Sequence, residues 1–423
     1  MTSEHREKES SLYTGIFVLL AVLAISSAVI YIVVSISRYK DFFNLGVYWG
    51  ADFTLYYMAI KSFFKTGSLY TENYWFINSP LAAMVLFPYL LFEPPTATAL
   101  KFIESLLLVS LNVYLLFRMV RKRALVFHVL LFATLGSQIL IQLFELNIYI
   151  EVVTLLMLAL YFNERGKKGL SAFSLAFAIM IKVFLLPLCL VPLIARDRRY
   201  FLFLVSYSLL LFLMTIPIFS LPSYNELYGA ISNNYPRIIE ELSGQIYFSS
   251  QFVGYHYLFD KVLLNDLNEG ALTFFKAASF FAFAVISLHI AYCMGIFRKK
   301  MAEPDLRRIF FLFVLTVLFL SCFYSFKGYF SVLFLPLIPL IAGGANEKLN
   351  NVLCIGYLLV LIDPHALIWF FERYSPGFMN VYEFFSFQLV GLNILFMGLY
   401  VSWLRRIKKQ PSVAQEGRTD TVP

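Results

Sequence analysis

Asp52 is the acidic residue whose surroundings best suit catalytic chemistry. It lies in the segment Tyr48–Pro80 (YWGADFTLYYMAIKSFFKTGSLYTENYWFINSP), the first long polar interval after a membrane-length apolar run. A carboxylate held at an apolar boundary can have its pKa raised toward working pH, which suits it to act as a general base. An acid near a helix start is equally explained as a cap or as a partner of the helix dipole. The residue type leaves both roles open.

Two lysines are candidates for binding an anion. Lys182 interrupts an apolar run, and Lys327 lies at the tip of a predicted hairpin between two apolar runs. A charged side chain at the centre of a span costs about 2.5–3.5 kcal/mol, so each ammonium group must reach a surface or a partner. Each lysine therefore either extends toward the membrane surface, or supplies a cation to a phosphate group there.

Other polar residues are predicted on the same face of the membrane as Asp52. Glu145 and Asn147 share the short turn QLFELN, and His256 lies in a long segment rich in Tyr. Turn residues are usually solvated, and Tyr at this level usually forms an interfacial belt rather than a sugar-stacking platform. The chain has no glycine-rich phosphate loop and no His-Glu-x-x-His, Cys-x-x-Cys or Gly-x-Ser-x-Gly motif. These absences argue against an ATP-driven pump and a zinc protease.

The elements that must position these residues are membrane helices. Of 423 residues, 60% are hydrophobic and 14% charged, and the mean hydropathy is +0.74. Apolar runs of about 18–25 residues recur along the chain, which is the length that spans a bilayer. We therefore predict an all-α polytopic membrane protein with about twelve spans. The net charge of +8 is attributed to cytoplasmic loops rather than to binding of nucleic acid.

The positive-inside bias places every cluster of Lys and Arg on the cytoplasmic side, together with both termini. The predicted parts are a cytoplasmic tail at 1–11, a membrane domain at 12–404 and a cytoplasmic tail at 405–423. Two long outer loops are expected at 38–95 and 222–270. The first should contain amphipathic helices lying in the interface, with Asp52 near the start of one.

The region around Lys182 has two interpretations. Residues 169–181 and 183–195 are each short for a span, so they form either a hairpin or one tilted span. The hairpin is preferred because it keeps Arg196, Arg198 and Arg199 inside and places Lys182 at an outer turn.

Several motifs resemble glycosyltransferase family 87, a family of membrane enzymes of the GT-C class, over roughly residues 45–340. The most specific block is Asp52-Phe53-x-x-Tyr56-Tyr57-x-Ala59, followed by Gly67-x-Leu69-Tyr70, Phe76 and Pro80. Weaker matches are the turn Phe144-Glu145-Leu146-Asn147, the set Gly169, Lys182 and Pro187, and Lys327-Gly328-Tyr329 ahead of Pro336 and Pro339. Three positions depart from the family pattern: Glu145 replaces Gln, Asn78 replaces Tyr, and the late hairpin lacks a His.

The resemblance implies a GT-C-type bundle and transfer of a sugar, typically mannose, from a polyprenyl-phosphate donor. It implies Asp52 as the base that deprotonates the acceptor hydroxyl. We expect Lys182 and Lys327 to bind the donor phosphate, and Tyr56, Tyr57, Glu145, Asn147 and His256 to contact substrate. No cofactor or divalent metal is expected to be required.

The expected partners are a glycolipid or glycan acceptor and membrane lipid, with inversion at the sugar. The expected location is a bacterial cytoplasmic (inner) membrane with the active site on the outer, periplasmic face. The alternatives are a transporter or flippase of lipid-linked sugars, and a polysaccharide polymerase or ligase. Transporters usually carry polar residues at mid-membrane with repeat symmetry, whereas the predicted spans are nearly free of acids except Glu151.

Overall fold

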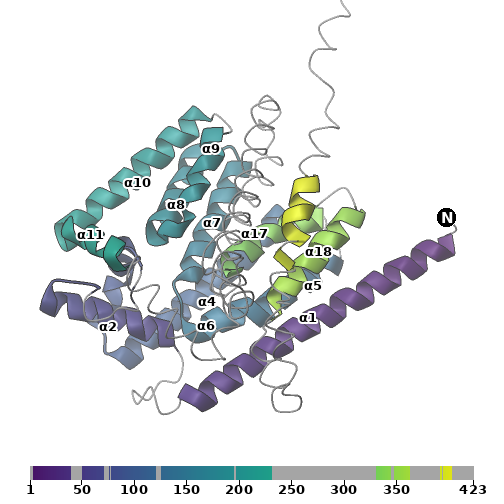
Figure 1. The fold of residues 1–423 in the computed structure, drawn as a ribbon, viewed down its shortest axis with the longest axis horizontal. Coiled ribbons are helices and arrows are strands. Elements are labelled where there is room, and N and C mark those ends of the chain that lie inside the picture. Colours follow the sequence, from purple (N-terminus) through teal and green to yellow (C-terminus); the bar gives the residue numbers. More distant parts are fainter. Residues whose placement is uncertain are drawn as a thin grey trace, which may run out of the picture.

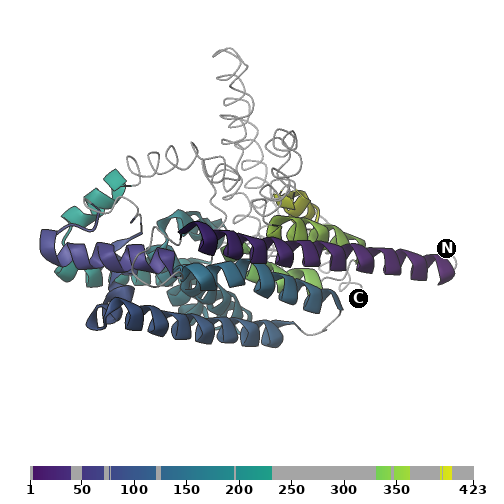
Figure 2. The ribbon, with the colours of Figure 1, turned by 90° about the horizontal axis from the view of Figure 1, so that it is seen from below.

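A computed structural model describes the chain at residues 3–39, 50–70, 76, 78–120, 125–194, 197–230, 330–343, 347–362, 391–392 and 394–402. The regular structure of these residues is helical, as Figures 1 and 2 show. Four of their helical stretches are long and apolar enough to cross a membrane: Leu12–Val33, Pro94–Met119, Leu125–Glu145 and Arg198–Phe219. The predicted helical membrane fold is confirmed, while the number of about twelve spans stays a prediction.

The first half of the chain supplies most of the described helices. The chain begins with α1 (Ser3–Tyr39), α2 (Ala51–Thr66), α3 (Pro80–Leu86) and the 3₁₀ helix η1 (Phe87–Leu91). The bundle itself contains α4 (Pro94–Met119), α5 (Leu125–Thr134), the π-helical turn η2 (Leu135–Ile139), α6 (Leu140–Glu145), α7 (Tyr149–Glu164), α8 (Lys168–Ile181), the 3₁₀ helix η3 (Val183–Cys189), α9 (Leu190–Ile194), α10 (Arg198–Phe219) and α11 (Pro222–Gly229). Later in the chain lie α17 (Phe330–Gly343) and α18 (Glu347–Leu361).

Local sequence signals explain where several helices begin and end. Ser79 caps α3 by accepting a hydrogen bond from Ala82 N, and Pro80 follows in the first turn. The Pro pair at 94–95 begins α4. Asp197 caps α10 by accepting from Tyr200 N at 3.2 Å. Gly67, with φ at 79°, ends α2 in the left-handed conformation that glycine favours.

The chain reverses direction at Lys182. Lys168 at the start of α8 forms an ion pair of 2.7 Å with Asp197 at the start of α10. The chain must therefore run along α8 in one direction and come back through η3 and α9 before α10 begins. This geometry confirms the hairpin interpretation over the single tilted span. Lys182 itself is extended (φ −124°, ψ 93°) and lies between the two apolar helices.

Because the chain reverses at Lys182, different charged residues lie at the two ends of the bundle. Lys168, Arg198 and Arg199 lie at the end where α8 and α10 begin. At the opposite end lie Lys182, α2 and α11, the latter two at the left of Figure 1, with α11 above α2. α8 packs between α7 and α10, and α3 packs against both α8 and α10. The segment predicted to form the first outer loop is thereby joined to the end of the bundle that carries Lys182.

Several predicted features lie outside the described residues. They are Lys327, His256, most of the predicted second outer loop at 222–270, and the predicted C-terminal tail at 405–423.

Candidate active site

Asp52 lies in the first turn of α2, an amphipathic helix. Phe53, Tyr56, Tyr57 and Ile60 are buried on one side of this helix, while Met58 and Phe64 are exposed. The residue before α2 is Gly50, whose φ of 80° favours glycine and whose N–H donates to Phe144 O at 2.8 Å. No side chain caps α2. The capping role considered for Asp52 is therefore not the one it has.

The Asp52 carboxylate is instead bound by the turn after α6. Asn147 Nδ2 donates to Asp52 Oδ2, and Asn147 Oδ1 accepts from Tyr149 N at 3.2 Å. The preceding residue, Leu146, is buried and has a positive φ of 54°. A left-handed conformation at a residue other than glycine is strained, and such residues concentrate at functional sites. The turn thus directs the Asn147 amide at Asp52 at a conformational cost.

Lys182 reaches the same region from the end of α8. Its Nζ donates to Asn78 Oδ1 at 2.5 Å and lies 4.2 Å from the centre of the Tyr149 ring. A cation over an aromatic face is stabilised by the quadrupole of the ring. Lys182 is only 8% exposed, so it does not extend its ammonium group into water. The structure brings Asp52, Asn147 and Lys182 together from three distant parts of the sequence.

The charges of Asp52 and Lys182 influence each other without forming an ion pair. Among the described residues the ion pairs join Lys101 to Glu104 and Glu151, and Lys168 to Asp197. Part of the Asp52 side chain is exposed, but its carboxylate is surrounded by protein. Burial raises the pKa of Asp52 above its ordinary value of 3.8, opposed by the Asn147 hydrogen bond and by the positive charge of Lys182. Burial lowers the pKa of Lys182 to about 7, opposed by Asp52.

The remaining described candidates have partners within the protein. Tyr57 donates its hydroxyl to Phe92 O at 3.0 Å, and the Tyr56 ring packs edge-on against Phe76. Both tyrosines belong to α2 and are buried. Glu145 is half-buried and accepts a hydrogen bond of 2.7 Å from the Tyr31 hydroxyl of α1. Contact of these three residues with substrate stays a prediction.

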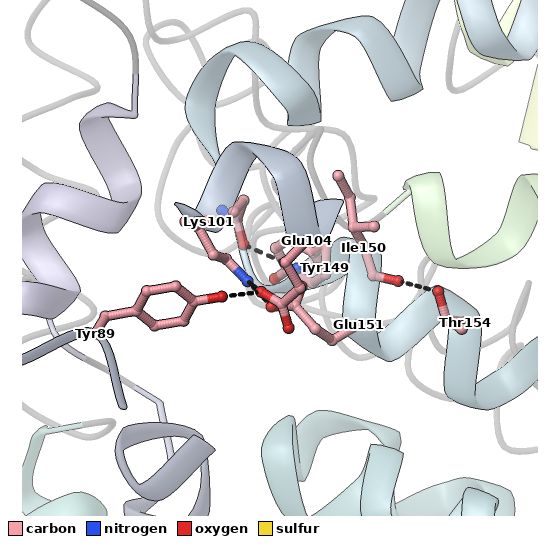
Figure 3. A network of polar contacts seen from close by, with 8 residues as sticks. Tyr89, Lys101, Glu104, Tyr149, Ile150, Glu151 and Thr154 are labelled. Atoms are coloured by element: carbon pink, nitrogen blue, oxygen red, sulfur yellow. Dashed lines mark hydrogen bonds and ion pairs between the residues drawn. The ribbon is translucent and has the colours of Figure 1, made fainter. Parts of the chain in front are cut away.

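A second group of charged residues lies beside this site and was not foreseen from the sequence. Lys101 on α4 is 1% exposed and forms ion pairs with Glu104, at 2.8 Å, and with Glu151 of α7. The Tyr89 hydroxyl donates to Glu104 Oε2 at 2.5 Å. Figure 3 shows these side chains converging between η1, α4 and α7. We call Tyr89, Lys101, Glu104 and Glu151 the Lys101 cluster.

The Lys101 cluster is connected to the candidate active site on two sides. Tyr89 packs edge-on against Phe53, the residue after Asp52, with ring centres 5.3 Å apart. Glu151 lies one helical turn after Asn147. The cluster therefore ties together the helices that present the carboxylate and its amide partner. The only sequence signal was the unusual position of Glu151 in an apolar run.

Asn78 is the other residue that the sequence did not identify as functional. It attracted notice only as a departure from a family pattern, yet its side chain is the hydrogen-bond acceptor for Lys182. Within the described part of the chain, no group of three or more His, Cys, Asp or Glu side chains is arranged to hold a metal ion.

The fold and site define a helical membrane protein with a partly buried acid and a buried cation at one end of its bundle. The family model of glycosyltransferase family 87 matches residues 76–325, more than half of the chain. The chain therefore belongs to glycosyltransferase family 87 and is a membrane glycosyltransferase. The match includes Asn78, Asn147 and Lys182 and begins after Asp52. No curated protein and no solved structure matches the chain.

Proposed function

We propose that this glycosyltransferase transfers a hexose, typically mannose in the family, from a polyprenyl-phosphate donor to a hydroxyl group of a glycolipid or glycan. The observation that carries the proposal is the meeting of Asp52 and Lys182 without an ion pair between them. One group is placed to accept a proton and the other to bind an anion.

In the proposed reaction the acceptor oxygen attacks the anomeric carbon from the side opposite the phosphate. Asp52 takes the proton of that hydroxyl as the new carbon–oxygen bond forms. Asn147 binds Oδ2, while no hydrogen bond among the described residues reaches Oδ1, which is the oxygen we assign as base. The raised pKa of Asp52 makes it a stronger base than an exposed aspartate.

The bond between the anomeric carbon and the phosphate oxygen breaks as the lipid phosphate leaves with the electron pair. The Lys182 ammonium group stabilises the negative charge on that phosphate. A lipid phosphate is a good leaving group, so one carboxylate suffices where a glycosidase uses two. The configuration at the sugar inverts. Lys327 is proposed as a second cation and lies outside the described residues.

The location of the site supports catalysis on the outer face of a bacterial inner membrane. Lys168, Arg198 and Arg199 lie at the end of the bundle opposite Lys182. Because basic residues favour the cytoplasmic side, this arrangement supports an outward-facing position for Asp52 and Lys182. Lipid-linked donors are available at that face once they have crossed the bilayer.

The proposal is tested with purified protein in vesicles that contain a radiolabelled polyprenyl-phosphate hexose. Thin-layer chromatography measures transfer to an added acceptor, and a membrane-impermeant probe measures movement of the donor between leaflets. We expect label in the product, with no need for added divalent metal. Movement of donor between leaflets without transfer would instead identify a flippase. Mass spectrometry of lipid that co-purifies with the protein identifies the donor independently.

A further inference from the structure

Each of the two charged groups of the candidate active site is hydrogen-bonded to a neutral amide. Lys182 Nζ donates to the side-chain oxygen of Asn78, and Asp52 accepts from the side-chain nitrogen of Asn147. The carbonyl end of one amide therefore faces the cation, and the NH₂ end of the other faces the anion. Each charge is hydrogen-bonded but not neutralised, although opposite charges in a protein interior attract strongly.

The Asn78 amide is fixed in place by its neighbours. Its residue is 3% exposed, and its backbone oxygen accepts a hydrogen bond of 2.9 Å from the Tyr70 hydroxyl. The next residue, Ser79, donates its hydroxyl to Met180 O near the end of α8. The acceptor for Lys182 is thus attached to the same helix that carries Lys182. We propose that Asn78 is a positioning residue that holds the Lys182 ammonium group away from Asp52 until substrate arrives.

The proposed separation has a consequence for both partners of the reaction. A direct ion pair would stabilise the charged form of Asp52 and make it a weaker base. It would also cancel the positive charge that Lys182 offers to a phosphate. A neutral acceptor takes one hydrogen bond from the Lys182 ammonium group and leaves the positive charge of that group available. The face of the Tyr149 ring likewise stabilises the ammonium group without neutralising it. This inference rests on the roles proposed above for Asp52 and Lys182.

The charged and titratable groups around the pair belong to several elements. The charge of Asp52 affects the pKa of Lys182, and the charge of Lys182 affects the pKa of Asp52. On neighbouring elements the titratable residues are Tyr70, Tyr89, Lys101, Glu104, Glu145, Tyr149, Glu151, Tyr224 and Glu226. Lys101, Glu104 and Glu151 are engaged with one another, Glu226 accepts from Ser68, and Glu145 accepts from Tyr31. Asp52 is therefore the partner that Lys182 would reach if Asn78 released it.

The experiment measures the pKa of Lys182 directly, without any substrate. Purified full-length protein in detergent is acetylated with a trace of reagent over a range of pH, and mass spectrometry gives the reactivity of Lys182 relative to an exposed lysine. In Asn78→Leu, which removes the acceptor but keeps a similar volume, we expect the Lys182 pKa to rise by about 1–3 units through pairing with Asp52. The double variant Asn78→Leu with Asp52→Asn should not show this rise.

Two further variants complete the design. Asn112→Leu is the matched control, because Asn112 is a buried asparagine on α4 that donates to Thr154 at 2.8 Å, and it should leave the Lys182 pKa unchanged. Asn78→Asp preserves shape and provides a second test if Asn78→Leu does not fold. This variant places a carboxylate beside the Lys182 ammonium group, so the Lys182 pKa should rise and should remain raised when Asp52→Asn is added.

Three results would overturn the proposal. They are an unchanged Lys182 pKa in folded Asn78→Leu, a rise that persists without the Asp52 carboxylate, and an unchanged pKa in Asn78→Asp. Because no sugar transfer is measured, a failure here is distinct from a failure of the proposed enzymatic function.

Transfer kinetics add a second readout. Asn78→Leu should move the acid limb of the pH–rate profile to lower pH by about one unit or more, which a loss of stability alone would not do.

Discussion

Two groups of buried charges lie at the same end of this helical bundle, and they are arranged in opposite ways. In the Lys101 cluster the ammonium group contacts two carboxylates directly, and Glu104 also accepts from Tyr89. In the candidate active site Lys182 and Asp52 are held apart, each by the side chain of an asparagine. Lysine and carboxylate side chains therefore occur once as a network of direct ion pairs and once as a pair without an ion pair between them.

The difference indicates which group is structural and which is available for chemistry. In a direct network the charges are paired with one another, and this pairing joins the helices that contribute to it. A separated pair retains a carboxylate that can accept a proton and an ammonium group that can bind an anion, at the expense of electrostatic stabilisation. Perturbed groups of this kind are concentrated at functional sites. Substitutions in the two groups should consequently affect different properties of the protein.

The largest effect on stability is expected for Lys101→Met. Removing the ammonium group leaves Glu151 buried without its partner, which costs about 3–5 kcal/mol of unfolding free energy. Denaturation of the purified protein in mixed micelles measures the change. Adding Glu151→Leu should restore much of the loss, since it removes the uncompensated charge. A stable single variant would show that the cluster does not hold the helices together.

The second effect is on donor binding in Lys182→Met. A hydrogen bond to a charged group contributes about 1.5–3 kcal/mol, so kcat/KM for the donor should fall roughly 10- to 100-fold, through a raised KM for the bound phosphate and a lowered kcat for its departure. The unfolding free energy should change by less than that of Lys101→Met, because Lys182 forms no ion pair with any described residue. An unchanged KM for the donor would remove Lys182 from the phosphate site.

The pH dependence of kcat/KM separates the two titrating groups. Asp52 must be ionised to act as a base, so activity should fall as pH drops through its raised pKa, above 3.8. Lys182 must be charged to bind phosphate, so activity should also fall as pH rises through about 7. Each limb should approach tenfold per pH unit. Lys182→Arg should remove the alkaline limb, because arginine stays charged.

The smallest effect is expected for Glu145→Gln. The amide oxygen can still accept from the Tyr31 hydroxyl, so a residue that only joins α6 to α1 should tolerate the change with less than about a threefold loss of kcat/KM. A larger loss, with a raised KM for the acceptor, would show that Glu145 binds substrate. Steady-state kinetics at varied acceptor concentration distinguish these results.

The helices were predictable because their signal is local. The sequence has apolar runs at 96–117 and 148–162, which occur as α4 and α7 within a few residues, and the basic residues before α10 favoured the hairpin at Lys182. Asp52 and Lys182 attracted attention because each contradicts its apolar surroundings.

The partners of these residues were not predictable from the same patterns. The direction of Asn147 depends on the left-handed backbone of Leu146, and the contact of Asn78 with Lys182 depends on the packing of α3 against α8. No pattern in the sequence predicted that the packing of α4 and α7 would bring Lys101 against Glu151. Such contacts arise from tertiary packing, which sequence periodicity does not encode.

The most direct test of the account compares Asp52→Asn with Glu104→Gln in single-turnover sugar transfer from saturating polyprenyl-phosphate hexose. Both variants replace a carboxylate by an amide of the same shape, one at the candidate active site and one in the Lys101 cluster. We predict a loss of 100-fold or more for Asp52→Asn, the usual range for a general base, and less than about tenfold for Glu104→Gln. An Asp52→Asn enzyme that transfers within about tenfold of the wild-type rate would contradict the account.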